Sequence, residues 1–110
     1  MINRLFVYGS LAPGCPNEHI LAKLSGIWET AHVCGHLREE GWGAGLGFPG
    51  IVLDDMGQEV RGSIFTSDQL NSFLPELDEF EGQGYRRVVA QATLLDQKTI
   101  VQCYIYELNA

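Results

Sequence analysis

The chain has 110 residues, 45% of them hydrophobic, and carries 14 acidic against 7 basic side chains, for a formal net charge of -7. This size and composition predict one domain over residues 1–110 with a substantial core, and they exclude a disordered chain. The acidic balance, with no basic patch beyond Arg86 and Arg87, argues against nucleic acid or an anionic membrane as a partner.

No stretch of the sequence is long and apolar enough for a membrane span, and none has the layout of a secretory signal. Cys15, Cys34 and Cys103 lack the spacing of a metal site, and an odd number of cysteines favours reduced thiols. We therefore expect a cytoplasmic protein.

The first elements of the chain are a strand, a short helix and a second strand. Residues 2–8 are apolar and β-favouring, which predicts a buried strand. Asn17 is placed to cap a short helix over 18–24, which Ser25 and Gly26 end. Residues 27–38 alternate in the way that an extended segment does.

A glycine-rich loop over 41–50 follows. It holds five glycines, so its backbone can bend freely, and we expect Trp42 and Phe48 to be pocket walls. It is not a phosphate-binding loop, because no Gly-Lys-Ser or Gly-Lys-Thr follows.

Strands are expected again at 51–53 and 59–66, on either side of a turn at 54–57, and at 85–95 and 99–107. Short strands dominate and do not alternate regularly with long helices. The chain therefore predicts an α+β fold with a mixed, barrel-like β-sheet flanked by short helices.

A helix is expected between these strand groups, capped by Thr66 or Ser67. Pro75 should divide it into two short pieces, since proline disrupts a helix interior. Gly82 and Gly84 should end it. Its apolar residues form a stripe at helical spacing: Leu70, Phe73, Leu74, Leu77 and Phe80.

The turn at Tyr8-Gly9-Ser10-Leu11 ends the first strand. Gly9 lets a ligand approach the backbone closely, and consecutive amides in such a turn can bind a carboxylate or an oxyanion. The alternative interpretation is a plain strand end with a tight turn.

Four carboxylates gather at the end of the second helix, where the helix dipole disfavours negative charge. A local violation of this kind is often a functional site. Glu81 is the candidate, because a partly buried carboxylate there would have a raised pKa suited to acid–base chemistry. For Asp78 and Glu79 a solvated acidic face is the expectation.

The Tyr8–Leu11 turn and the Leu77–Gly82 stretch, with Tyr85 and Arg86 after it, together resemble the γ-glutamylcyclotransferase-like superfamily. Within it, the chain is similar to the small AIG2-like and γ-glutamylamine-cyclotransferase-like proteins. The likeness covers nearly the whole chain, including Pro16-Asn17 and the strand Val101–Tyr106.

The resemblance implies a mixed β-barrel with one cavity and a reaction without a metal or organic cofactor. The α-amine of a small γ-glutamyl substrate attacks its own γ-carbonyl, which yields 5-oxoproline and a free amine. The resemblance assigns Tyr8, Gly9, Ser10 and Leu11 to the substrate site and Glu81 to catalysis.

The chemistry agrees with this assignment. An α-amine near neutral pH is largely protonated, so a base must take its proton, and the leaving amine must later receive one. Glu81 can do both in turn. The Gly9–Leu11 amides are candidates for holding either the oxyanion or the substrate's α-carboxylate. Ser10 is expected to bind and not to attack, since it has no Gly-x-Ser-x-Gly context.

Tyr85 and Tyr104 are further substrate-binding candidates. Tyr85 and Arg86 are strand neighbours, so at most one of them faces inward, and Arg86 has the alternative of pairing with the acidic cluster. Tyr104 and Tyr106 share one strand face, and one of them is expected to line the cavity; core packing with a bonded hydroxyl is the alternative.

Two rival functions follow from other features. His32, Cys34 and His36 alternate on one strand face and would supply three zinc ligands, although packed histidines and a buried thiol are the preferred interpretation. The second rival is a non-catalytic binding or regulatory module on the same scaffold. In the enzyme, residues 41–50 are expected to recognise the leaving amine.

Overall fold

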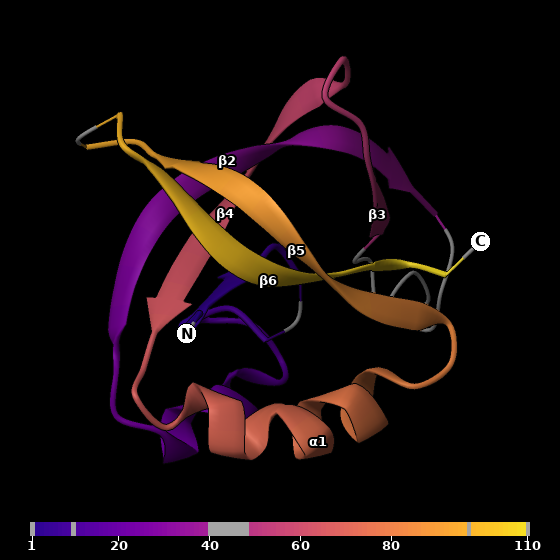
Figure 1. The fold of residues 1–110 in the computed structure, drawn as a ribbon. Helices are drawn as coiled ribbons and strands as arrows, with labels where there is room; N and C mark the ends of the chain where they lie inside the picture. Colours follow the sequence, from indigo (N-terminus) through magenta and orange to yellow (C-terminus); the bar gives the residue numbers. More distant parts are fainter. Residues whose placement is uncertain (1, 10, 40–48, 97, 110) are drawn as a thin grey trace.

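The computed structural model describes residues 2–9, 11–39, 49–96 and 98–109. Ser10, Trp42 and Phe48, to which the sequence assigned roles, lie outside the described residues. Within these ranges the elements in chain order are β1 (Arg4–Val7), the 3-10 helix η1 (Glu18–Lys23), β2 (Ile27–Arg38), β3 (Gly50–Leu53), β4 (Gln58–Thr66), α1 (Leu70–Glu81), β5 (Tyr85–Leu94) and β6 (Ile100–Leu108) (Figure 1).

The strands form one mixed sheet in the order β3-β2-β4-β1-β6-β5, and a further pairing of β2 with β5 closes it into a barrel (Figure 1). The pairings are antiparallel except β1 with β6, where Leu5 lies opposite Tyr104. β2 contacts β5 at only two registered positions, Ala31 with Leu94 and His32 with Thr93. The barrel is therefore open between β2 and β5 beyond this point.

The sheet buries the face that lines the barrel interior and the part of its outer face that η1 and α1 cover. The barrel interior is filled by side chains that alternate along the strands, among them Phe6, Ile64 and Ile105. The opposite face packs against η1 and α1 through Leu5, Leu74 and their neighbours. Residues at even and odd positions of one strand thus serve two different cores, as the strand period of two requires.

The predicted α+β, barrel-like class and the strand positions are confirmed, and β2 has the predicted bounds of 27–38. The predicted break at Pro75 is wrong: α1 is a single helix from Leu70 to Glu81 (Figure 1). A proline in the second turn removes one backbone hydrogen bond, to the Asn71 carbonyl. The buried Leu74 and Leu77 on either side of it hold the helix together.

The helix starts also differ from the predicted caps. Gln69 is the N-cap residue of α1, and Ser67 lies two residues earlier, where its hydroxyl accepts a hydrogen bond from the Gln69 amide at 3.1 Å. Asn17 precedes the helix as expected, but the helix is a 3-10 helix and the Asn17 side chain makes no capping hydrogen bond to it. No helix among the described residues is long and apolar enough to cross a membrane.

Candidate active site

Glu81 is the last residue of α1, and the helix positions it firmly. Leu74 and Leu77 are buried against the outer face of the barrel, and Leu77 lies one turn before Glu81 on the same side of the helix. Gly82 then leaves the helix with φ of 77°, a conformation that favours glycine, while its amide donates to the Asp78 carbonyl at 3.0 Å. The carboxylate is thus held at the junction between α1 and β5.

Burial raises the pKa of the Glu81 carboxyl to about 7. The shift arises because a poorly hydrated site disfavours the charged form. A carboxyl with this pKa exists in both protonation states near neutral pH, which is the requirement for taking up a proton and giving it back.

Tyr8, from the turn after β1, lies within the electrostatic reach of Glu81. Burial raises the pKa of the Tyr8 hydroxyl above its ordinary value, and the charge of Glu81 adds to this. The hydroxyl donates to the Tyr106 carbonyl at 2.7 Å and accepts from the Ile51 amide at 3.1 Å. The charge of Glu81 therefore acts on Tyr8 of the other sequence motif, and the Tyr8 proton is committed to a backbone carbonyl.

The turn that follows Tyr8 is closed by a hydrogen bond of 3.1 Å from the Ala12 amide to the Gly9 carbonyl. The Leu11 side chain is buried in the core on the helix side, so any contact of Leu11 with a ligand would come from its backbone.

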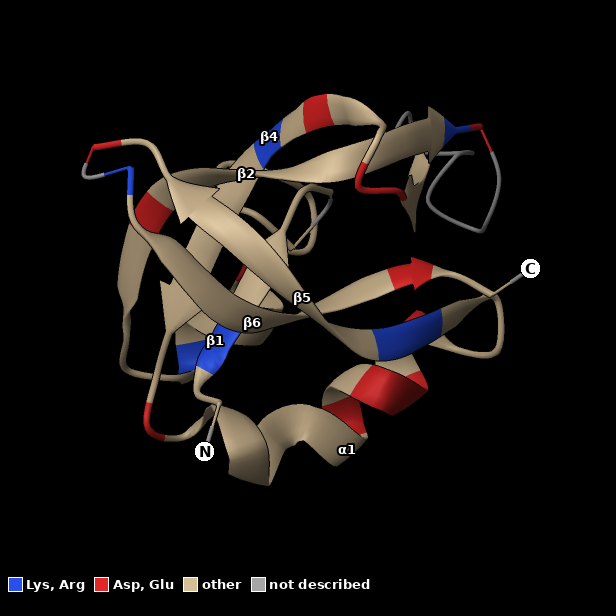
Figure 2. Cartoon of the chain, turned by 45° about the horizontal axis from the view of Figure 1, so that its top comes forward, with Lys and Arg blue, Asp and Glu red and all other residues tan. Residues whose placement is uncertain are grey.

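Asp78 is exposed, as expected for an acidic face, but it also makes two specific contacts. It accepts a hydrogen bond from the Tyr106 hydroxyl at 2.7 Å and lies 3.4 Å from the Arg87 guanidinium. Figure 2 shows the acidic end of α1 beneath the basic start of β5. Asp78, Tyr85, Arg87 and Tyr106 line a small pocket of about 190 Å³ beside the helix end.

The other sequence candidates separate between the two faces of the sheet. Tyr85 and Tyr104 both pack on the helix side, and the Arg87 guanidinium lies 5.1 Å above the Tyr104 ring. Tyr85 lines the small pocket beside the helix end and acts electrostatically on the Tyr8 hydroxyl, whereas the contacts described for Tyr104 are with Arg87 and the core. Arg86 pairs with Glu107 and not with the acidic helix end.

A family model described as "Gamma-glutamyl cyclotransferase, AIG2-like" matches residues 5–110. The chain belongs to this family. The comparison with curated proteins found no match.

Solved structures show the same fold as this AIG2-like chain. YkqA from Bacillus subtilis is 31% identical with a TM-score of 0.75, and the match covers 99% of this chain but only 36% of YkqA. An AIG2-like protein from Mus musculus is 23% identical with a TM-score of 0.70, over 96% of this chain and 76% of the mouse chain. A structure titled "Gamma-glutamyl cyclotransferase" is 21% identical with a TM-score of 0.65, over 96% and 66%.

Sequence reasoning missed Glu107 in this AIG2-like domain. It is a carboxylate that is only 6% exposed, and its Oε2 accepts from the Leu53 amide at 3.1 Å. A signal was present: Glu107 follows Cys103 and Ile105 at the period of two that marks the barrel interior. A charged side chain at such a position is rarely buried without partners.

The two histidines among the three proposed zinc ligands have separate partners in the AIG2-like domain. His32 lies 3.1 Å from Glu59, and His36 lies 2.9 Å from Asp54. Among the described residues, no group of three or more His, Cys, Asp or Glu side chains is arranged to hold a metal ion. The interpretation of Cys34 as a buried thiol is wrong, because it is partly exposed.

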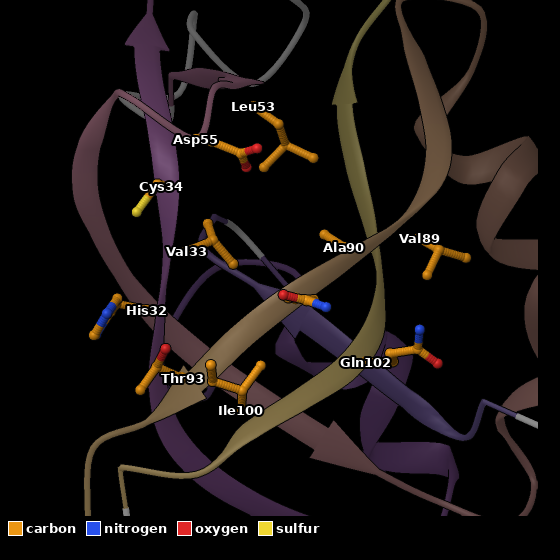
Figure 3. Close-up of a pocket in the computed structure, with 11 residues that line it drawn as sticks. His32, Val33, Cys34, Leu53, Asp55, Val89, Ala90, Thr93, Ile100 and Gln102 are labelled. Carbon is orange, nitrogen blue, oxygen red and sulfur yellow. The ribbon is translucent and has the colours of Figure 1, made fainter.

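His32 and Cys34 instead border a pocket of about 610 Å³ at the opening between β2 and β5 (Figure 3). Leu53 and Ala90 are among its apolar lining residues, and Gln102 is among the polar ones. Leu53 and Ala90 also pack against the barrel interior, so this pocket adjoins the same core as Tyr8.

Glu81→Gln is expected to stabilise the fold at alkaline pH. The folded-state pKa of about 7 lies above the ordinary glutamate value of about 4.3 in the unfolded chain. The folded protein therefore binds more protons between these values, and its stability falls as pH rises through this window. Glutamine does not ionise, so the variant should exceed the wild type by about 1–3 kcal/mol at pH 8.

Urea unfolding of both proteins at pH 4 and pH 8 measures this difference. The gap should nearly vanish at pH 4, where Glu81 is mostly protonated in both states. Glu79→Gln, which alters an exposed carboxylate of the same helix, is the matched control and should gain no stability at pH 8. An equal effect of the two substitutions at both pH values would contradict the burial of the Glu81 charge.

Proposed function

We propose that this chain is a γ-glutamyl cyclotransferase that converts a small γ-glutamyl compound into 5-oxoproline and a free amine or amino acid. The observation that carries the proposal is Glu81, a carboxylate with a pKa of about 7 at the end of α1, within electrostatic reach of the Tyr8 hydroxyl. Membership of the AIG2-like family supports the reaction class.

The proposed reaction begins with the substrate's α-ammonium group. Ionised Glu81 removes a proton, and the α-nitrogen then attacks the γ-carbonyl carbon of the same molecule to close a five-membered ring. Because nucleophile and electrophile belong to one molecule, correct orientation supplies much of the acceleration. The negative charge that develops on the carbonyl oxygen needs donors, for which the backbone around Gly9 and Leu11 is our candidate.

Collapse of the tetrahedral intermediate breaks the bond to the leaving nitrogen. The protonated Glu81 gives its proton to that nitrogen, which departs as a neutral amine and regenerates the carboxylate. The ring nitrogen loses its remaining extra proton to water as neutral 5-oxoproline forms. One carboxyl can serve both steps because its pKa lies near the operating pH. Tyr8 does not compete for this proton transfer, since its own proton is held by the Tyr106 carbonyl at 2.7 Å.

A non-catalytic binding module on the same fold is the second candidate. A ligand-binding domain gains nothing from a charge that burial destabilises, so the raised pKa of Glu81 favours the enzyme.

A turnover panel distinguishes the two functions. Purified protein is incubated with γ-glutamyl amino acids, the γ-glutamyl-lysine isopeptide and glutathione, and 5-oxoproline is quantified against time. The enzyme is expected to release 5-oxoproline and amine in equal amounts from at least one of them. Saturable binding of a panel member with no release would support the binding module and overturn the proposal.

A further inference from the structure

The barrel seam at β3 is closed by side chains in place of a neighbouring strand. β3 pairs with β2 along one edge, from Gly50 opposite Arg38 to Leu53 opposite Gly35. On its other edge, the Ile51 amide donates to the Tyr8 hydroxyl and the Leu53 amide donates to Glu107 Oε2, both at 3.1 Å. Residues two apart present their amides to the same edge of a strand. The two side-chain contacts therefore take the places of the backbone hydrogen bonds that a neighbouring strand would make with Ile51 and Leu53.

Glu107 is itself held by a charged partner. Arg86 and Glu107 are direct cross-strand neighbours in the β5–β6 ladder. Arg86 Nε lies 2.9 Å and Nη2 2.7 Å from Glu107 Oε1. One carboxylate oxygen therefore binds the guanidinium while the other binds β3, and the buried charge is satisfied from both sides.

The Tyr8 and Glu107 contacts meet at the end of β6. The Tyr8 hydroxyl that accepts from Ile51 also donates to the Tyr106 carbonyl, immediately before Glu107. Both side chains thus fasten β3 to adjacent residues of β6. Loosening β3 at Leu53 would disturb the Ile51 contact that orients the Tyr8 ring in the candidate active site.

We propose that Glu107, together with Arg86, is a positioning residue of the active site, which fixes β3 and through it the Tyr8 side chain. The expected change in KM rests on the proposed function. The expected fixing of β3 rests only on the hydrogen bonds described above. Glu107 moves no proton in the reaction: its role is to hold Tyr8 and β3 where the γ-glutamyl group binds.

The test compares Glu107→Ala with Glu107→Gln, which keeps a side-chain oxygen for the Leu53 amide. Glu107→Ala is expected to raise KM for the γ-glutamyl substrate by about 10- to 100-fold, the typical cost of a small misplacement. Glu107→Gln should recover most of this loss. The acidic limb of the pH profile should keep its midpoint near 7 in both, because Glu81 still provides the proton transfer.

Amide hydrogen exchange tests the fixing of β3 by Glu107 without an activity assay. Exchange at both Leu53 and Ile51 should accelerate in Glu107→Ala relative to the wild type. If Glu107→Ala does not fold, Arg86→Met can be used in its place, since it changes a largely exposed side chain. Arg86→Met should accelerate exchange of the Leu53 amide. Glu59→Gln, which alters a carboxylate paired with His32 and outside this seam, is the control and should change neither readout.

Several results would overturn the inference. One is unchanged Ile51 exchange in a variant whose Leu53 amide exchanges faster, since the two contacts would then be independent. Another is an unchanged KM in folded Glu107→Ala. A third is Glu107→Gln as impaired as Glu107→Ala with a displaced pH midpoint, which would make Glu107 a proton-transfer group. Absence of 5-oxoproline from the wild type would refute the proposed function, while the exchange data would still decide whether Glu107 fixes β3.

Discussion

Glu81→Gln is expected to lower kcat/KM for 5-oxoproline release by about 10²- to 10⁴-fold, the usual contribution of a positioned acid–base group. Glutamine keeps the size and hydrogen-bonding shape of glutamate but cannot accept the ammonium proton. The fold should survive, since the substitution removes a charge that burial disfavours. Steady-state kinetics with circular dichroism as the folding check measure both expectations.

Glu79→Gln is the matched control for this experiment. Glu79 belongs to the same acidic helix end but is exposed, so its substitution should leave kcat/KM within about twofold of the wild type, as expected for a solvated surface position. Full activity of Glu81→Gln would remove Glu81 from the mechanism. Equal losses in both variants would assign the effect to the overall acidity of the helix end.

Leu77→Ala should destabilise the fold by about 2–5 kcal/mol, the range for truncating a fully buried leucine. Leu77 is completely buried between α1 and the outer face of the barrel. Its removal leaves a cavity where the helix rests on the sheet, one turn before Glu81. In urea, the unfolding midpoint should fall with little change in the m-value, because the surface exposed on unfolding is nearly the same.

Leu37→Ala makes the same chemical change at a position on β2 that is 49% exposed. It should cost less than about 1 kcal/mol, since little area is removed from a packed environment. A Leu77→Ala variant no less stable than Leu37→Ala would show that α1 is not held to the barrel through this contact. The support of Glu81 would then have to come from elsewhere in the helix.

Strand positions were predictable because alternation and turn residues are local properties of the chain. The Asp54–Gly57 turn illustrates this: the Gly57 amide donates to the Asp54 carbonyl at 2.8 Å, as the turn composition predicts. The pairing of β1 with β6 was not predictable in the same way. It joins Leu5 to Tyr104 in parallel, and such long-range register depends on how the whole barrel packs.

Helix continuity through Pro75 was mispredicted because tertiary burial outweighed a local penalty. The loss of one backbone hydrogen bond is a local cost, whereas burying Leu70, Leu74 and Leu77 on the sheet acts on the whole helix. Local rules identify the penalty but not the packing that opposes it.

The candidate site was partly predictable, because Glu81 carries a local signal and the other contacts do not. Glu81 stood out because a carboxylate at a helix C-terminus conflicts with the helix dipole. The hydroxyl contacts of Tyr8 and the contact of Glu107 with the Leu53 amide could not be predicted, since each depends on β3 lying beside β6. Only the folded seam brings Ile51 and Leu53 to their side-chain acceptors.

The pH dependence of kcat/KM for 5-oxoproline release tests the central claim most directly, because it requires both the reaction and a carboxylate with a raised pKa at the end of α1. The wild type is predicted to show activity that rises with pH through a midpoint near 7, as Glu81 ionises. The residual activity of Glu81→Gln should lack this limb. No 5-oxoproline at any pH, or a rising limb that persists unchanged in Glu81→Gln, would contradict the assignment of Glu81 as the acid–base of a γ-glutamyl cyclotransferase.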